Sequence, residues 1–215
     1  LDEAVAQGQP AGLKTLGGWT TFYEGLSSLP AQMQRSWLAF APYYSDQAFP
    51  AALPLVFADH PQRLLDVGGN TGRWAVQCAR HDPAVHITIA DLPPQLEFAR
   101  ATIKQHGLEV RVDCFAVDLL DEAQSLPAGY DAIWMSQFLD CFSEAEIVSI
   151  FKRCYDALDE NGQVIILEPY WDRQKYETAA FCLQQTSIYF TALANGNSQM
   201  YSAEVFMKCV TDAGF

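Results

Sequence analysis

Apolar residues form five short runs with the spacing of strands, separated by stretches with the spacing of helices. The strand-like runs cover residues 63–67, 85–91, 109–118, 130–136 and 160–168. The helix-like stretches between them cover residues 72–80, 93–106 and 143–158. Since strands that alternate with helices pair in parallel through right-handed crossovers, we predict an α/β fold, a doubly wound (Rossmann-like) and mostly parallel sheet with helices on both faces.

Polar signals mark where three helices begin. Pro93 and Pro94 suit a first helical turn, in which proline's missing N–H is no loss. Ser143 and Glu146 have the spacing of a capping box, and Ser202 is the expected cap of a last helix.

Composition and charge narrow the possible partners. Of the 215 residues, 50% are hydrophobic, and the net charge is −13, so the phosphate backbone of a nucleic acid would be repelled. No apolar run reaches the length of a membrane span. The six cysteines and four histidines lack ligand spacing, which predicts buried free thiols in a reducing, cytoplasmic environment, histidines at the surface and no metal site.

In a doubly wound sheet, ligands bind beyond the carboxyl ends of the strands. The residues that end the five predicted strands are Asp66, Asp91, Asp118, Ser136 and Glu168. A single acidic residue at such a place is explained equally well as a helix cap. Four of them at one edge of the sheet favour a shared ligand.

The turn after the first strand reads Gly68-Gly69-Asn70-Thr71-Gly72, which leaves a dinucleotide and S-adenosylmethionine as candidate ligands. The dinucleotide pattern G-x-G-x-x-G fails, because Asn70 and Arg73 stand at its second and third glycines. The pattern D-x-G-x-x-x-G fits from Asp66 onward. A carboxylate there would repel a pyrophosphate and attract the amino group of S-adenosylmethionine.

Other residues suit the remaining groups of this cofactor. Asp91 is expected to bind both ribose hydroxyls, Leu92 to face the adenine, and Asp118 to accept from the adenine amino group beside Leu119. Asn70 tolerates the left-handed conformation that glycine would otherwise supply. The cofactor-binding residues expected from this arrangement are Asp66, Gly68, Gly69, Asn70, Gly72, Asp91, Leu92, Asp118 and Leu119.

The stretches "LLDVGGNTG", "ADLP", "VDLL" and "CYDALDENGQVIILE" resemble the class I methyltransferases. More narrowly, they resemble the plant and bacterial small-molecule O-methyltransferases related to the caffeic-acid and hydroxyindole enzymes. The resemblance implies transfer of a methyl group from S-adenosylmethionine to a small aromatic or otherwise apolar acceptor, with S-adenosylhomocysteine as product. It adds Ser136, Gln137 and Tyr43 to the expected cofactor contacts.

The family's catalytic base is a histidine, and its usual partner is a glutamate at the end of the fifth strand. Asp140 stands at the position of this histidine, Cys141 follows it, and Glu168 occupies the partner's position 28 residues after Asp140. Burial beside Glu168 would raise the pKa of one carboxyl, and Asp140 could then serve as base for an acidic phenol or enol. A helix-capping or loop residue that faces water is the competing interpretation of Asp140.

Three hypotheses therefore stay open at this point. The chain is a methyltransferase whose catalytic residues are Asp140 and Glu168, or one that needs no base because positioning supplies the rate. Alternatively, it binds the cofactor without transferring its methyl group, as a hydroxylase- or decarboxylase-like enzyme or as a non-catalytic binding protein.

Two aromatic-rich segments flank the predicted sheet. We expect residues 1–61 to form a helical N-terminal segment that packs on the core and covers the cofactor, ahead of a methyltransferase domain at residues 62–215. Residues 170–200 are expected to form a helical insertion beside a substrate pocket. By resemblance, a C-terminal hairpin follows residue 215, and an N-terminal domain supports a homodimer in the full-length protein.

Overall fold

The computed structural model describes residues 1–40 and 45–215. Contacts between residues divide the chain into two compact units, which we describe separately. The sheet unit comprises residues 31–136 and 153–167. The helical unit comprises residues 1–30, 137–152 and 168–215. The predicted domain boundary at residue 61 stays a prediction.

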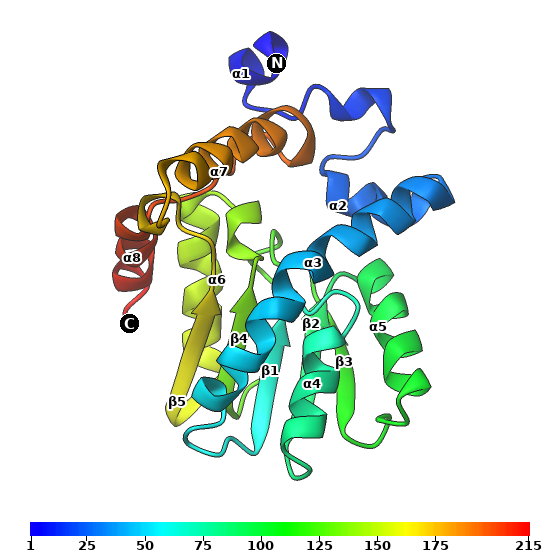
Figure 1. Cartoon of the computed structure of the whole chain (residues 1–215), viewed down its shortest axis with the longest axis vertical. Helices are drawn as coiled ribbons and strands as arrows, with labels where there is room; N and C mark the ends of the chain where they lie inside the picture. Colours follow the sequence, from blue (N-terminus) through cyan, green and yellow to red (C-terminus); the bar gives the residue numbers. More distant parts are fainter. The chain divides into compact units, whose positions relative to one another are not determined.

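The sheet unit contains five parallel strands in the order β3-β2-β1-β4-β5 (Figure 1). They are β1 (Arg63–Val67), β2 (His86–Asp91), β3 (Val112–Ala116), β4 (Tyr130–Ser136) and β5 (Leu158–Leu167). The chain moves outward from β1 to β3 and then returns to the other side of β1 with β4. This reversal is the topological switch point of a doubly wound sheet, so the predicted fold class is confirmed.

Helices cover the sheet and build its core. They are α3 (Ala31–Val56), α4 (Arg73–His81), α5 (Pro93–Gln105) and the last turn of α6 (Glu144–Ala157). Figure 1 shows α3 and α4 crossing one face of the sheet. There Trp74 of α4 stacks on Trp134 of β4 with ring centroids 4.3 Å apart and contacts Phe49 of α3 at 4.9 Å. Trp74 is therefore a packing residue of the core.

The helical unit combines α1 (Asp2–Gln7), α2 (Phe22–Gly25), the first turns of α6, α7 (Glu177–Tyr189) and α8 (Ala203–Asp212). Four 3-10 helices join them, namely η1 (Leu13–Thr15), η2 (Leu26–Ser28), η3 (Leu139–Cys141) and η4 (Trp171–Arg173). A π-helical turn, η5 (Phe190–Ala194), directly extends α7, which is orange in Figure 1. The helical insertion predicted for residues 170–200 is therefore interrupted by a π turn, which the sequence did not predict.

Most predicted helix starts are confirmed. The Ser143 backbone N–H donates to Glu146 Oε2 at 2.7 Å, which completes the capping box, and the Ser202 side chain accepts from the Val205 N–H. Two strand ends differ from the predicted runs. β3 ends at Ala116, two residues before Asp118, and β5 ends at Leu167, one residue before Glu168. β1 ends at Val67, as predicted, so Asp66 is its last residue but one. β3 also starts late, since a turn closed by Arg111 N–H and the Leu108 carbonyl occupies residues 108–111.

Candidate active site

The glycine-rich turn lies between β1 and α4 and brings bare backbone against Asp66. Gly68, Asn70 and Gly72 have φ angles of 72°, 50° and 75°, all in the left-handed region. Asn70 thus adopts the conformation expected of it. Gly69 has a different role, because a Cβ atom there would lie 2.5 Å from Asp66 Oδ2 and 2.8 Å from Ile89 Cγ2.

The carboxyl group of Asp66 is almost fully buried, and one of its oxygens lacks a hydrogen-bond partner among the described residues. Its side chain is 2% exposed, and Oδ2 has no hydrogen-bond partner among the described residues. Burial, and then the nearby charge of Asp91, raise the pKa of Asp66 to about 8. A buried carboxylate needs a cationic or hydrogen-bonding partner, so this position fits a ligand's ammonium group.

Asp91 ends β2 and holds the turn in place. Its Oδ2 accepts from the Asn70 backbone N–H at 2.8 Å, and its Oδ1 accepts from the Leu92 N–H at 2.7 Å. Burial raises the pKa of Asp91 to about 6, although these two hydrogen bonds oppose the rise. The carboxylate oxygens keep free lone pairs and can accept from a diol as well.

The structure gives less direct evidence for the other predicted cofactor residues. In the sheet unit, Asn70 Oδ1 and Ser136 Oγ are buried and have no partner among the described residues, so both are available to a polar ligand. Asp118 caps its own turn by accepting from the Leu120 N–H at 2.9 Å, and Leu119 is buried. Tyr43 lies outside the described residues. Its role stays a prediction.

Glu168 directly follows β5 and binds the start of η3 in the helical unit. Its Oε1 accepts from the Phe138 N–H at 2.8 Å and from the Leu139 N–H at 2.9 Å. Its Oε2 is buried without a partner among the described residues. Gln137, one residue before Phe138, has a left-handed φ of 50°, which is uncommon for a residue with a side chain and typical of functional turns.

Asp140 and Glu168 are half-buried carboxyl groups that interact electrostatically. Burial raises the pKa of Asp140 to about 6, against a hydrogen bond from Cys141 that lowers it. Burial, and then the charge of Asp140, raise the pKa of Glu168 well above its usual range. The pair therefore disfavours double ionisation, and one of its two carboxyls holds a proton more readily than an exposed carboxyl does. Asp140 is half-buried, and its role stays a prediction.

Two residues that sequence reasoning did not assign to the site lie beside Asp140. Tyr23 Oη lies 2.9 Å from Cys141 Sγ, and Cys141 Sγ donates to Asp140 Oδ1 at 3.4 Å. Adjacency to Asp140 was a signal for Cys141. No local signal in the sequence could have identified Tyr23, which precedes Cys141 by 118 residues.

The sequence signature of the O-methyltransferase domain matches residues 52–215, most of the chain. The chain belongs to the O-methyltransferase domain family. The resemblance inferred from the strand-end motifs is confirmed.

Known members of this family align along all or part of the chain. L-tyrosine C(3)-methyltransferase of Streptomyces lavendulae is 24% identical over 214 residues, which are 99% of this chain and 57% of the relative. 3-Hydroxy-5-methyl-1-naphthoate 3-O-methyltransferase of Streptomyces sahachiroi is 34% identical over 114 residues, or 53% of this chain and 32% of the relative. The solved apo structure of the S-adenosylmethionine-dependent methyltransferase SibL matches with a TM-score of 0.74 and 29% identity, covering 100% of this chain and 62% of that one.

The aligned part of the chain therefore covers less than two thirds of each of these proteins, between 32% and 62% of their length.

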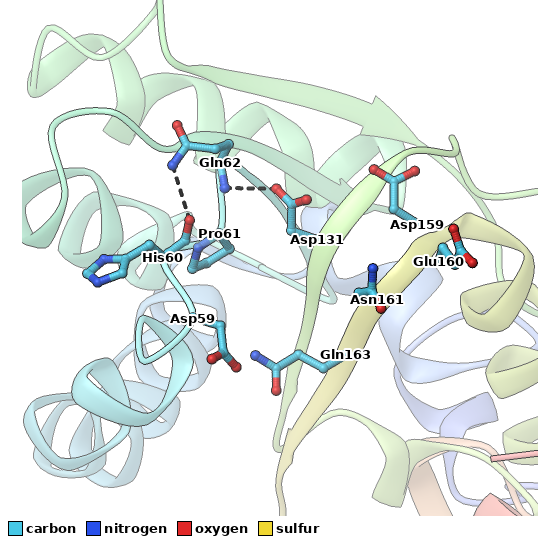
Figure 2. A pocket seen from close by; sticks show the side chains of 10 residues that line it. Asp59, His60, Pro61, Gln62, Asp131, Asp159, Glu160, Asn161 and Gln163 are labelled. Carbon is cyan, nitrogen blue, oxygen red and sulfur yellow. Dashed lines mark hydrogen bonds between the residues drawn. The ribbon is translucent and has the colours of Figure 1, made fainter.

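A separate depression of about 570 Å³ lies at the amino ends of the strands of this O-methyltransferase domain (Figure 2). Its lining includes Asp59, Asp131, Asp159 and Glu160 and has no lysine or arginine. Asp131 accepts from the backbone N–H groups of Gln62 and Arg63, each at 2.8 Å. This depression is at the edge opposite to Asp66 and Asp91, so it is no part of the predicted site.

Other predictions for this O-methyltransferase domain can be compared with the structure. All four histidines are exposed, and all six cysteines are free, as expected. The predicted burial of the thiols is wrong for Cys182, which is exposed, and holds only in part for Cys114 and Cys141. Within residues 1–40 and 45–215, each helix is too short or too polar to reach across a membrane. The same residues contain no cluster of three or more histidine, cysteine, aspartate or glutamate side chains arranged for a metal ion.

Proposed function

We propose that the protein is a methyltransferase that uses S-adenosylmethionine to methylate a small, apolar and acidic acceptor, foremost at oxygen. When bound, S-adenosylmethionine supplies an electrophilic methyl group on a sulfonium sulfur and leaves as S-adenosylhomocysteine. The single observation that carries the proposal is Asp66, whose buried carboxyl beside the glycine turn has an oxygen without a partner among the described residues.

Asp66 would bind the amino group of the cofactor's methionine part, since an ammonium ion is the partner that a buried carboxylate needs. Asp91 would bind the ribose hydroxyls by charge-assisted hydrogen bonds. The close approach at Gly69 keeps side-chain atoms away from Asp66 and leaves the cofactor room beside the backbone. Contacts from Leu92, Asp118, Leu119, Ser136, Gln137 and Tyr43 are part of the proposal.

Asp140 is the proposed base for the acceptor hydroxyl, and Glu168 is its neutral partner. With a pKa of about 6, Asp140 is mostly ionised at neutral pH, yet it is a stronger base than an exposed aspartate. The proton of the acceptor hydroxyl would move to Asp140, which would leave the acceptor oxygen as the nucleophile for the methyl group that the bound cofactor would supply. An aspartate can deprotonate an acidic phenol or enol more readily than an aliphatic alcohol.

The names of two relatives support this acceptor class. The Streptomyces sahachiroi relative, 34% identical over half of this chain, is named for 3-O-methylation of a hydroxynaphthoate. The Streptomyces lavendulae relative, which aligns with 99% of this chain, is named for methylation of L-tyrosine at C(3). This second name favours one further candidate, transfer to an aromatic carbon, because a phenolate is nucleophilic at ring carbons as well as at oxygen.

Two experiments test the proposal. Isothermal titration with S-adenosylmethionine should show binding that Asp66→Asn weakens at least tenfold; no binding by the unaltered protein would overturn the proposal. Transfer of a labelled methyl group should then be screened over phenols, hydroxynaphthoic acids, carboxylic acids and amines. NMR of the product separates an O-methyl from a C-methyl group. Binding without transfer to any of these acceptors would favour the non-transferring alternative.

A homodimer and a cytoplasmic location stay predictions, and both concern the whole protein rather than the residues described above. Size-exclusion chromatography with light scattering on the full-length protein tests the first of them.

A further inference from the structure

Asp140 stands at one end of a hydrogen-bonded row of side chains that the proposed mechanism does not use. The row runs from Asp140 through the thiol of Cys141 to the hydroxyl of Tyr23, with sulfur-to-oxygen distances of 3.4 Å and 2.9 Å. Tyr23 comes from α2 and Cys141 from η3. Tyr189 of α7 lies near Tyr23 and interacts with it electrostatically.

The chemistry of the groups fixes the direction of these hydrogen bonds. A carboxylate can only accept, so the single proton of the thiol points to Asp140. The Tyr23 hydroxyl must then donate to the sulfur. Donation into the sulfur polarises the thiol and strengthens its own donation to the carboxylate.

Both groups are donors and not bases at neutral pH. Burial, and then the charge of Asp140, raise the pKa of Cys141 well above its usual range. Burial, and then Cys141, raise the pKa of Tyr23 in the same way. Neither group can therefore take the acceptor's proton, which leaves Asp140 as the group that they act upon.

The surroundings hold this row in one geometry. The Asn195 side chain donates to the Cys141 carbonyl, and the Tyr201 hydroxyl donates to the Phe142 carbonyl at 2.7 Å. The ring of Phe22 contacts the rings of Tyr23 and Tyr189 edge to face, with centroids 6.2 Å and 6.3 Å away. The π-helical turn begins directly after Tyr189, and such turns are frequent at functional sites.

We propose that Tyr23 and Cys141 are positioning residues, which orient the carboxylate of Asp140 and stabilise its ionised form through the row Tyr23–Cys141–Asp140. This rests on the proposed function, in which Asp140 is the base. A histidine at position 140 would present a ring nitrogen in a fixed direction. The row of side chains fixes the direction of the Asp140 carboxylate instead. An aspartate has a freely turning carboxylate, and one directed hydrogen bond from Cys141 sets its orientation.

The pH dependence of Asp140 involves the titratable groups that interact with it among residues 1–40 and 45–215. These groups are Glu168 after β5, Cys141 in η3, Tyr23 in α2, Tyr189 in α7 and Tyr201 before α8. The phenols and the thiol stay neutral across the range of an assay. The acidic limb of the rate profile therefore reports Asp140 beside a protonated Glu168.

The experiment compares Cys141→Ala, Cys141→Ser and Tyr23→Phe in the full chain. Loss of the thiol donor should move the acidic limb of the kcat profile upward by roughly half to one pH unit and lower kcat about tenfold, with the cofactor's Kd unchanged. Cys141→Ser keeps a donor and should restore the limb to its original pH or below. Tyr23→Phe should have a smaller effect in the direction of Cys141→Ala.

A double-mutant cycle tests whether Tyr23 acts through Cys141. In the Cys141→Ala background, Tyr23→Phe should cause no further change in kcat, whereas independent packing effects would add. Cys209→Ala, which removes a buried thiol in α8 of the same unit, and Tyr176→Phe, at an exposed tyrosine, are the matched controls. Unaltered limbs in both Cys141 variants, or full additivity, would overturn the proposal.

One readout needs no catalysis. Carbon NMR of protein with labelled aspartate carboxyls follows the titration of Asp140 directly, and Asp140→Asn assigns its signal. Cys141→Ala should move this titration to higher pH whether or not a methyl acceptor has been found. If the titration moves while no acceptor is methylated, the proposed function fails and the positioning row stands; an unmoved titration rejects the row itself.

Discussion

A Cβ atom added at Gly69 would lie 2.5 Å from Oδ2 of Asp66, closer than two such atoms approach in proteins. The glycine therefore leaves the Asp66 carboxylate open at the place where the cofactor's amino group is proposed to bind. Gly69→Ala must push this carboxylate or Ile89 away. We expect the Kd for S-adenosylmethionine, measured by isothermal titration, to rise at least tenfold.

Gly18→Ala is the control for this substitution, because a Cβ atom there would meet no atom within 4 Å. It should leave the Kd within about twofold of the original. An unchanged Kd in Gly69→Ala would show that the cofactor does not use this face of Asp66.

Asp66 should make the stability of the protein without cofactor depend on pH. Its pKa is about 8 in the folded protein against 3.8 for the ordinary side chain, so the folded state binds the proton more tightly. The stability that this group contributes is fully present below about pH 4 and is lost as the pH rises toward 8. Asp66→Asn is neutral throughout and removes this dependence.

Urea unfolding at pH 5 and at pH 8.5 measures the effect. At the higher pH we expect Asp66→Asn to be more stable than the unaltered protein by about 1–3 kcal/mol, the cost of a buried group without a partner. The difference between the two proteins should shrink at pH 5. Asp91, Asp140 and Glu168 also have raised pKa values and give the same sign, so only the difference between the two proteins isolates Asp66.

Cofactor binding should release a proton from Asp66. At pH 7 the carboxyl is mostly protonated without ligand, and an ammonium ion beside it favours the ionised form. The binding enthalpy of the cofactor, measured by calorimetry in phosphate and in Tris, should differ between the two buffers. The difference should correspond to the ionisation enthalpy of the buffers for about one proton released. Asp66→Asn should remove this difference between the buffers; if it stays, another group loses the proton.

The sequence predicted the parallel sheet because buried strands read as continuous apolar runs and the helices between them have their own period. It placed the acidic residues of the site for the same reason, since the ends of β1, β2 and β5 are visible as the ends of those runs. Asp118 was placed at a strand end although β3 stops two residues earlier, since residues 117 and 118 continue the alternation and the Val117 N–H still donates to the Asp91 carbonyl of β2.

Tyr23 could not be found in this way. Its relation to Cys141 depends on packing between α2 and η3, which no local pattern encodes, and one phenylalanine or tyrosine in an aromatic segment resembles the next. The π turn after α7 was also hidden, because its residues keep the apolar character of a regular helix.

Glu168→Gln and Asp140→Asn should differ sharply in activity although both remove a carboxyl. The glutamine oxygen can still accept from the Phe138 and Leu139 N–H groups, and its amide resembles the protonated carboxyl that the raised pKa of Glu168 implies. We expect Glu168→Gln to keep kcat within about tenfold at pH 7. Asp140→Asn removes the base and should lower kcat by about 10²–10⁴ for a phenol that must lose its proton.

The acidic limb in Glu168→Gln should stay near pH 6, because Asp140 ionises beside a neutral partner in both proteins. A phenol acid enough to be ionised at the assay pH provides the control, since Asp140→Asn should then recover most of the rate. Suppose instead that Glu168→Gln proved as inactive as Asp140→Asn, and that the ionised phenol restored the rate of Glu168→Gln but not that of Asp140→Asn. Glu168 would then be the group that removes the proton, and Asp140 would be its orienting partner.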